Sequence, residues 1–95
     1  MDQLTLGKAN KKEGVTYLKA YPLKSYNEIS KIKEDLTQGS IVILRFTPLA
    51  QKSIEELAKT VDELYKFAIA LGGDIARLGE DRIVITPPGV KIFRG

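Results

Sequence analysis

The run Ile41-Val42-Ile43-Leu44 restricts the fold more than any other feature of this chain. Its residues are all apolar and mostly β-branched, and Arg45 is the first polar residue after it, a pattern typical of a strand that is covered on both faces. The run is far too short to cross a membrane. A strand of this kind needs neighbouring strands and a covering layer, so the rest of the chain must supply them.

Two segments with helical periodicity flank this strand. The first opens with Ser25 and Glu28, the spacing of a capping box, and closes at Gly39, where a left-handed residue is favoured. The second is longer, opens with Ser53 and Glu56 in the same spacing, and closes at a glycine pair. Apolar residues recur every three or four positions in both, which predicts two amphipathic helices that cover one face of a sheet.

Further segments have the composition of strands. Residues 15–21, 75–78 and 82–86 are rich in β-branched, aromatic and aliphatic side chains. The short Gly-Glu-Asp segment between the last two predicts a hairpin. Residues 90–93 follow a Pro-Pro-Gly break and are expected to form a fifth strand at the sheet edge.

The order of these elements is β-α-β-α-β-β. It predicts an α/β two-layer sandwich, with two helices on one face of a four- to five-stranded mixed sheet. Residues 1–14 show no periodicity and are expected to be a flexible leader. Residues 15–95 are expected to form the single folded core domain.

Composition argues against catalysis. The chain has no cysteine and no histidine, so it lacks thiolate nucleophiles, disulfides and the side chain that most readily moves protons near neutral pH. Its adjacent carboxylates fall on expected helix surfaces or at the hairpin tip, where solvated charge is their ordinary role. The glycine pair follows a helix and therefore makes no phosphate-binding loop. We expect no enzyme activity, no cofactor and no metal, and the missing disulfides fit a reducing cytosol.

The strands predict self-association. In residues 41–46 and 82–86 apolar side chains point to both faces, but two helices can cover only one. Because monomers rarely expose so large an apolar face, a homodimer is expected. The alternative is that the central strands are simply apolar on both faces, with the tails folded across. The wide apolar stripe of the second helix offers another dimer surface. The expected dimer contacts on the two surfaces are Val42, Leu44, Phe46, Val84, Tyr65 and Ile69.

The order and spacing of several short motifs are specific. They are KSYNEI at residues 24–29, GSIVI at 39–43, ALGGDI at 70–75 and IVITPPGV at 83–90. From about Tyr17 to Val90 the chain resembles the core domain of SepF, the cell-division protein that tethers the tubulin-like FtsZ to the membrane. The pattern is closest to an archaeal member.

The resemblance implies a non-enzymatic adaptor. A SepF-like dimer would capture the C-terminal peptide of FtsZ, in the cytoplasm at the division site, near the inner face of the membrane. An apolar peptide with charged flanks needs an apolar groove with charges at its rim. The family's groove corresponds to the last hairpin, so the expected partner-binding residues are Arg77, Leu78, Arg82, Ile83 and Ile85.

The chain departs from this family in two places. Members usually begin with an amphipathic membrane-binding helix, whereas residues 1–7 carry only three large apolar side chains, so membrane attachment is expected only through an anchor not evident here. Bacterial members tend to have a small residue in the long helix where this chain has Lys66. A lysine would hinder close helix stacking, which predicts discrete dimers without rings or filaments.

The same element order also occurs in small nucleic-acid-binding domains such as Alba. A basic hairpin would favour that function, but Glu80 and Asp81 accompany Arg77 and Arg82 here. Fifteen basic residues against twelve acidic ones leave little surplus charge for phosphates. Nucleic-acid binding is therefore the alternative, and a small regulatory domain has no motif in its favour.

Overall fold

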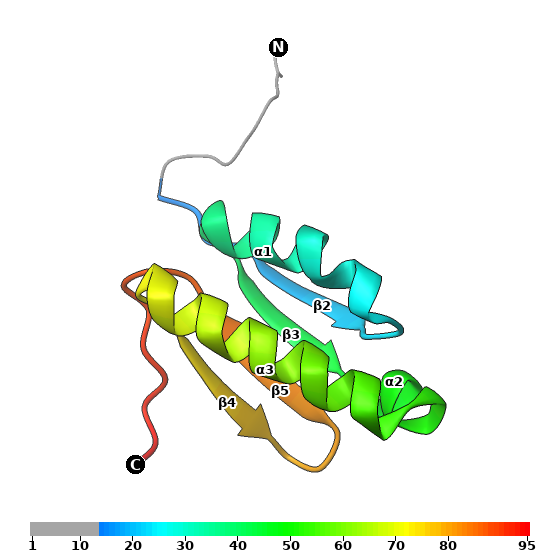
Figure 1. The fold of residues 1–95 in the computed structure, drawn as a ribbon. Coiled ribbons are helices and arrows are strands. Elements are labelled where there is room, and N and C mark those ends of the chain that lie inside the picture. The colour runs from blue at the N-terminus through cyan, green and yellow to red at the C-terminus, as the bar shows by residue number, and fades with distance from the viewer. Residues whose placement is uncertain (1–13) are drawn as a thin grey trace.

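The computed structural model describes residues 14–95, and Figure 1 shows them as one sheet with helices on one of its faces. In chain order the elements are β2 (Leu18–Pro22), the 3-10 turn η1 (Tyr26–Glu28), α1 (Ile29–Thr37), β3 (Ile41–Arg45), α2 (Thr47–Lys52), α3 (Ile54–Leu71), β4 (Asp74–Leu78) and β5 (Arg82–Thr86). The strands lie in the order β2-β3-β5-β4, with β2 parallel to β3 and the other two pairs antiparallel. The predicted α/β sandwich with a mixed sheet is confirmed. The leader expected for residues 1–14 falls, apart from Gly14, outside the described residues, and the domain boundary stays a prediction.

Side-chain caps set where the helices begin. Glu28 accepts a hydrogen bond from the Ser25 amide at 3.4 Å, and the predicted capping box is present. At α3, Ser53 Oγ accepts from the Glu56 amide at 3.0 Å, but the Glu56 carboxylate accepts instead from the backbone amide of Tyr26 at 2.8 Å. The prediction that the Glu56 side chain accepts from the Ser53 amide was therefore wrong, because this carboxylate links α3 to η1 instead.

The helix α2 was not predicted. Its sequence contains Pro48 shortly after the predicted strand, where a proline also serves to end strand pairing. Proline has no N–H to offer a ladder, but it fits the first turn of a helix, where that N–H has no partner in any case. Pro48 has that place in α2, and β3 ends at Arg45.

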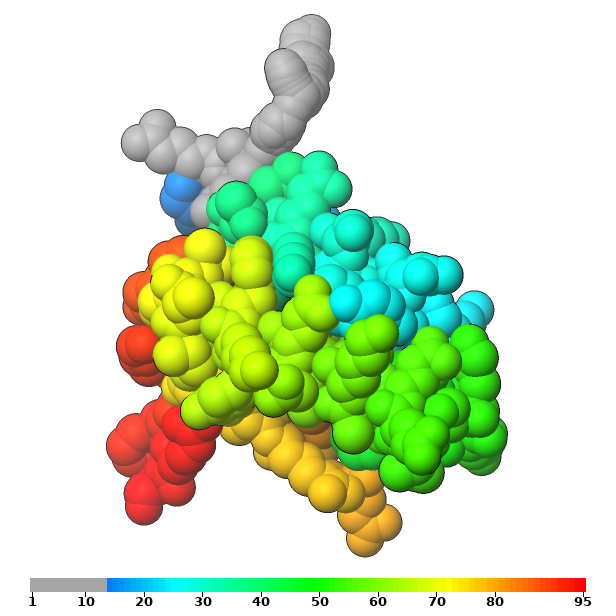
Figure 2. All heavy atoms as spheres, viewed as in Figure 1, coloured from blue at the N-terminus to red at the C-terminus, as the bar shows by residue number. Residues whose placement is uncertain are grey.

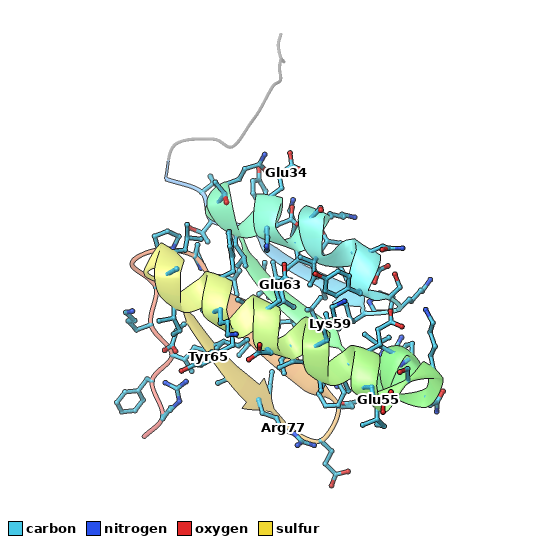
Figure 3. All side chains as sticks on the ribbon, viewed as in Figure 1. Glu34, Glu55, Lys59, Glu63, Tyr65 and Arg77 are labelled. Atoms are coloured by element: carbon cyan, nitrogen blue, oxygen red, sulfur yellow. The ribbon has the colours of Figure 1, made fainter. Side chains whose placement is uncertain are left out.

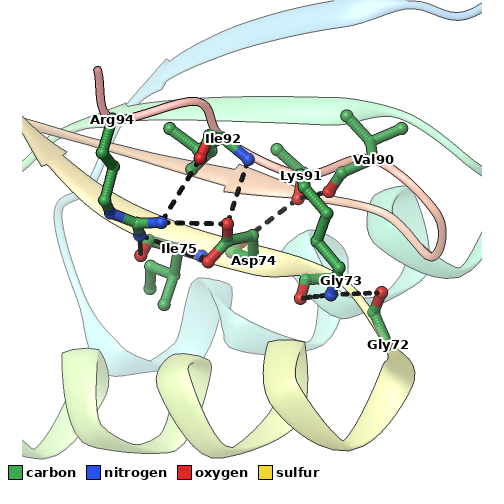
Figure 4. Close-up of polar contacts among 9 residues, drawn as sticks. Gly72, Gly73, Asp74, Ile75, Val90, Lys91, Ile92 and Arg94 are labelled. Carbon is green, nitrogen blue, oxygen red and sulfur yellow. Dashed lines mark hydrogen bonds and ion pairs between the residues drawn. The ribbon is translucent and has the colours of Figure 1, made fainter.

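The fifth strand expected at residues 90–93 is absent from the described structure. This segment runs beside β4 and is held by the side chain of Asp74 (Figure 4). The Asp74 carboxylate accepts from the amides of Ile75 at 2.9 Å and Ile92 at 3.0 Å, and the Arg94 guanidinium lies 3.2 Å away. Arg94 first, and then these amides, hold the pKa of Asp74 well below its usual range. The Asp74 side chain therefore accepts from the Ile92 N–H, which in a fifth strand would have bonded to a neighbouring strand.

The hydrophobic core lies between the sheet and the helices. Figure 2 shows that side chains of α1 and α3 cover most of the sheet on this side, with only its hairpin end emerging. Gly73 brings the end of α3 against the end of β5, since a Cβ there would lie 2.0 Å from the backbone oxygen of Thr86. The buried apolar side chains are Leu23, Ile29, Ile32, Leu36, Val42, Leu44, Leu49, Leu64, Ala68, Ile83 and Ile85.

One buried carboxylate fastens β2 to α1. Asp35 on α1 is 5% exposed and accepts hydrogen bonds from Lys19 Nζ at 2.9 Å and from the Tyr21 hydroxyl at 2.7 Å. Burial, followed by the hydrogen bond to Asp35, raises the pKa of Tyr21 to about 12. The contact positions the edge strand of the sheet.

Candidate partner-binding surfaces

The strand register decides which apolar residues are available to a partner. Val42 pairs with Ile85 and Leu44 pairs with Ile83, and all four side chains point toward the helices. Val42 and Leu44 have no exposed surface, so their assignment to a dimer contact was wrong. Ile85 is also fully buried in the core, so its expected contact with a partner was wrong for the same reason.

The opposite face of the sheet is uncovered within the described chain and largely apolar. Ile43 and Val84 are register partners at its centre, and both are half-buried. Leu18 on β2 and Leu78 on β4 lie at its two sides and are 63% and 49% exposed. We call this the open face. Its other apolar members are Ala20, Ile41 and Ala76.

Two arginines mark one end of the open face. Arg45 and Arg82 are register partners, and with Ala20, Pro22 and Ile43 they border a shallow hollow of about 170 Å³. Arg82 Nη1 also lies 3.2 Å from the neighbouring carboxylate of Asp81. The open face is therefore an apolar surface with a cationic corner.

A second hollow lies on the helix side of the sheet. Its volume is about 230 Å³, and its lining comes from β5, β4, α3 and the residue after β3. We call it the α3–β4 hollow. It contains Arg77 and Ile83, both predicted for partner binding, and Phe46, predicted as a dimer contact. The lining residues are Phe46, Leu57, Val61, Arg77 and Ile83.

Arg77 is the cation of the α3–β4 hollow. Figure 3 shows its side chain at the hairpin end of the sheet, beside α3. The guanidinium carbon lies 5.6 Å from the centre of the Phe46 ring, while Nε and Nη2 donate to the carbonyls of Gly79 at 3.1 Å and Glu80 at 2.9 Å. The hairpin turn thus holds the guanidinium in place, with other N–H groups left for a ligand.

The predicted partner-binding residues divide between two faces. Arg77 is paired with Ile83 in the register, and both line the α3–β4 hollow. Leu78 is paired with Arg82, and both point to the open face. Sequence reasoning missed Leu57 and Val61 as lining residues, although their apolar four-residue spacing on a helix was visible.

A third surface lies on α3. Tyr65 and Ile69 are 53% and 50% exposed, and Tyr65 lies on the side of α3 away from α1 (Figure 3). Beside them Lys66 extends into solvent, and its Nζ lies 3.1 Å from Asp62, one turn earlier on the helix. Both apolar side chains are accessible, so their place in a dimer contact stays a prediction.

The perturbed titratable groups belong to contacts between elements. Tyr26 on η1 donates to Glu63 on α3, which raises the pKa of Tyr26 and lowers that of Glu63, with Lys33 as a second donor to Glu63 at 2.9 Å. None of these groups lines the α3–β4 hollow. Within residues 14–95 we find no cluster of three potential metal ligands. No helix in that part of the chain has the length and apolarity needed to cross a membrane.

These features define a small α/β domain with an apolar open face and an apolar hollow beside Arg77. Comparison with known proteins gives the family. Residues 19–92 match the family model described as "Cell division protein SepF", and the chain belongs to this family.

The similar proteins come from archaea. The chain is 33% identical over 69 residues to the cell division protein SepF of Haloferax volcanii. The match covers 70% of this chain and 56% of the relative. The chain therefore spans only about half the length of that relative. Solved structures of SepF-like proteins from Archaeoglobus fulgidus and Pyrococcus furiosus each share 29% identity, with TM-scores of 0.76 and 0.77. They cover 82% and 87% of this chain, and the matches span 93% and 100% of those chains. The predicted resemblance to archaeal SepF is confirmed.

Proposed function

We propose that this chain is a non-enzymatic cell-division adaptor that binds the C-terminal peptide of FtsZ as a homodimer. It helps to link the division filament to the membrane, from the cytoplasm at the division site. The observation that carries the proposal is the α3–β4 hollow, in which Arg77 stands beside an apolar lining. Membership of a cell-division family favours this adaptor over the nucleic-acid alternative.

The α3–β4 hollow suits a short peptide. Phe46, Leu57 and Val61 are partly buried and pack against the core. Part of the apolar surface of each side chain is therefore still exposed to solvent. A large apolar side chain entering between them would remove that surface from water. The guanidinium of Arg77 stands at the same place and can donate charge-assisted hydrogen bonds to a carboxylate on the peptide. The hollow therefore selects an apolar residue close to an acidic one.

The open face suits a second copy of the chain. Ile43 and Val84 at its centre, with Ile41 beside them, form an apolar area that one subunit leaves without a covering layer. Two-fold pairing is the commonest way to cover such an area, because the same face of each subunit then covers that of the other. The α3 surface is less suited to extended stacking, because the charged Lys66–Asp62 pair lies beside its exposed apolar side chains. We expect discrete dimers.

A matched pair of charge reversals tests the peptide site. The C-terminal peptide of FtsZ from the same organism is titrated into the full chain and into the Arg77→Glu and Arg82→Glu variants. These arginines lie on the same hairpin but on opposite faces of the sheet. Arg77→Glu should weaken peptide binding by about tenfold or more, as expected for loss of a charge-assisted contact, and Arg82→Glu should not.

Two controls accompany this titration. Thermal unfolding must show that Arg77→Glu remains folded, because Arg77 also holds the hairpin turn, and Val61→Glu provides a second obstruction of the hollow if it does not. Random duplex DNA at two salt concentrations serves as the other ligand. Salt-sensitive DNA binding without any peptide signal would overturn the proposal in favour of nucleic-acid binding.

A further inference from the structure

The two edges of the sheet differ in what they leave open. At the β4 edge the C-terminal segment lies alongside the strand, and Arg94 Nη2 donates to the backbone oxygen of Ile75 at 2.9 Å (Figure 4). At the other edge, β2 pairs with β3 and with no other strand among the described residues. An edge strand of this kind presents a row of backbone donors and acceptors to another chain.

The residues that face outward on β2 follow from the ladder. Tyr17 accepts from the Ile41 amide and Leu23 donates to the Arg45 oxygen, both at 2.8 Å. Backbone groups alternate in direction along a strand, so odd-numbered residues of this segment bond to β3 and even-numbered ones point away. Leu18 and Ala20 therefore present both an N–H and a C=O at the edge.

A hollow adjoins this edge on the helix side. Its volume is about 200 Å³, and Tyr21, Ile32 and Leu44 give it an apolar floor. Lys24 and Lys31 stand at its border, with Lys31 Nζ 4.3 Å from the centre of the Tyr21 ring. A side chain on an added strand would reach this hollow, because alternate residues of a strand point to each face of the sheet.

The charge along the edge is cationic. Lys24 and Lys31 adjoin the hollow, whereas Lys19 on the edge strand is already paired with Asp35 at 2.9 Å. Glu28 also lines the hollow, and its carboxylate accepts from the Lys24 amide at 2.7 Å. The hollow therefore has two lysines against one carboxylate, and this excess of positive charge is available to a ligand.

This charge distinguishes between possible occupants. A second copy that paired its own β2 against this one would offer the segment Leu18–Pro22, which contains no acidic residue to complement Lys24 and Lys31. An acidic extended peptide has the complementary charge. The edge also stays accessible when a second copy covers the open face, because its hollow lies on the helix side of the sheet.

We infer that the edge of β2 that no described strand pairs with is a second docking site, which binds an acidic, extended peptide segment as an added strand. The backbone of the segment pairs with Leu18 and Ala20. Its side chains point alternately toward the lysine-bordered hollow and toward the rim of the open face, where Leu18 and Ala20 give apolar contact. This site is separate from the α3–β4 hollow at the opposite side of the sheet, and it holds independently of the proposed function.

A designed peptide tests the inference on the full chain labelled with ¹⁵N. The probe is a capped hexapeptide of alternating glutamate and valine, and its control has lysine in place of glutamate. We expect the glutamate peptide to shift the amide signals of Leu18 and Ala20 and slow their hydrogen exchange, and the lysine peptide to bind at least about tenfold more weakly. Equal binding of the two peptides, or glutamate-peptide shifts confined to the α3–β4 hollow, would overturn the inference. Protection of these amides that rises with protein concentration without peptide would also overturn it, since a second copy would then occupy the edge.

Variants of the edge complete the test. Ala20→Pro removes an outward N–H without touching the ladder to β3, a substitution that edge strands accept, and it should weaken the glutamate peptide about tenfold. Ala20→Ser keeps the N–H and should leave binding unchanged. If Ala20→Pro fails to fold, the double variant Lys24→Glu and Lys31→Glu takes its place and should reverse the preference between the two peptides. No reversal would contradict the charge argument.

Discussion

Replacing Tyr21 by phenylalanine tests how β2 is fastened to α1. The substitution keeps the ring and removes the hydroxyl that donates to Asp35 at 2.7 Å. The difference between a pKa of about 12 and the ordinary value of 10.0 corresponds to at most about 2.7 kcal/mol. Because the hydroxyl is only part-buried and solvent screens it, we expect Tyr21→Phe to lower the free energy of unfolding by about 1–2 kcal/mol at pH 8.

The contribution of the Tyr21 hydroxyl to the free energy of unfolding should decrease at high pH. The pKa of Tyr21 is raised in the folded state, so its contribution is fully present below pH 10.0 and is lost as the pH rises through about 12. Denaturant unfolding of the wild type and Tyr21→Phe should therefore show a difference that shrinks between pH 8 and the upper end of this window. Tyr65→Phe is the matched control, because Tyr65 is 53% exposed and should give no difference at either pH. A difference between wild type and Tyr21→Phe that stays constant across the window would refute the assignment of the energy to the hydroxyl–Asp35 contact.

Three further predictions concern the dimer, the α3–β4 turn and the C-terminal segment. Val84→Asp, at the centre of the open face, should give monomers by light scattering while Tyr65→Asp should not; the opposite result would place the dimer on α3. Gly73→Ala should unfold at clearly lower denaturant than the wild type, by about 3 kcal/mol or more, because its Cβ would clash with the Thr86 oxygen; an unchanged midpoint would contradict the close approach. Asp74→Asn should expose residues 90–94 to proteolysis at neutral pH. In the wild type the lowered pKa of Asp74 means that its contribution is present above pH 3.8 and is lost as the pH falls below it, so protection that does not depend on acidification would be evidence against the Asp74 contact.

Local signals predicted much of the fold. Ser25 caps η1, which leads into α1, and Ser53 caps α3. These caps and the glycines after each helix satisfy or end the helical backbone within a few residues. Pro48 was ambiguous, since proline both ends strands and starts helices, and only the tertiary structure decides between them. The segment at 90–93 has strand composition, but the Asp74 side chain holds it beside β4 without a ladder.

The faces of the sheet could not be assigned from one strand. Alternation separates Ile41 and Ile43 from Val42 and Leu44, but both sets are apolar, so the pattern does not say which set the helices cover. That choice depends on pairing between distant segments. In the paired sheet Val42 and Leu44 lie in the core and not at the expected dimer contact, and Ile43 lies on the open face.

Two of the five residues that line the α3–β4 hollow were predicted for partner binding. Arg77 and Ile83 were named from the hairpin, and their register pairing brings them together. Leu57 and Val61 belong to a helix distant in sequence, and their apolar spacing predicted burial and not a binding role. A hollow between a helix and a hairpin becomes visible only when both are placed.

The central claim is that the C-terminal peptide of FtsZ binds in the α3–β4 hollow. Chemical-shift mapping of that peptide, from the same organism, on the ¹⁵N-labelled full chain tests it most directly. The largest shifts should fall on Phe46, Val61 and Arg77, and the amides of β2 should be unaffected. Saturable shifts confined to the open face or to β2, or no saturable shifts at all, would contradict it.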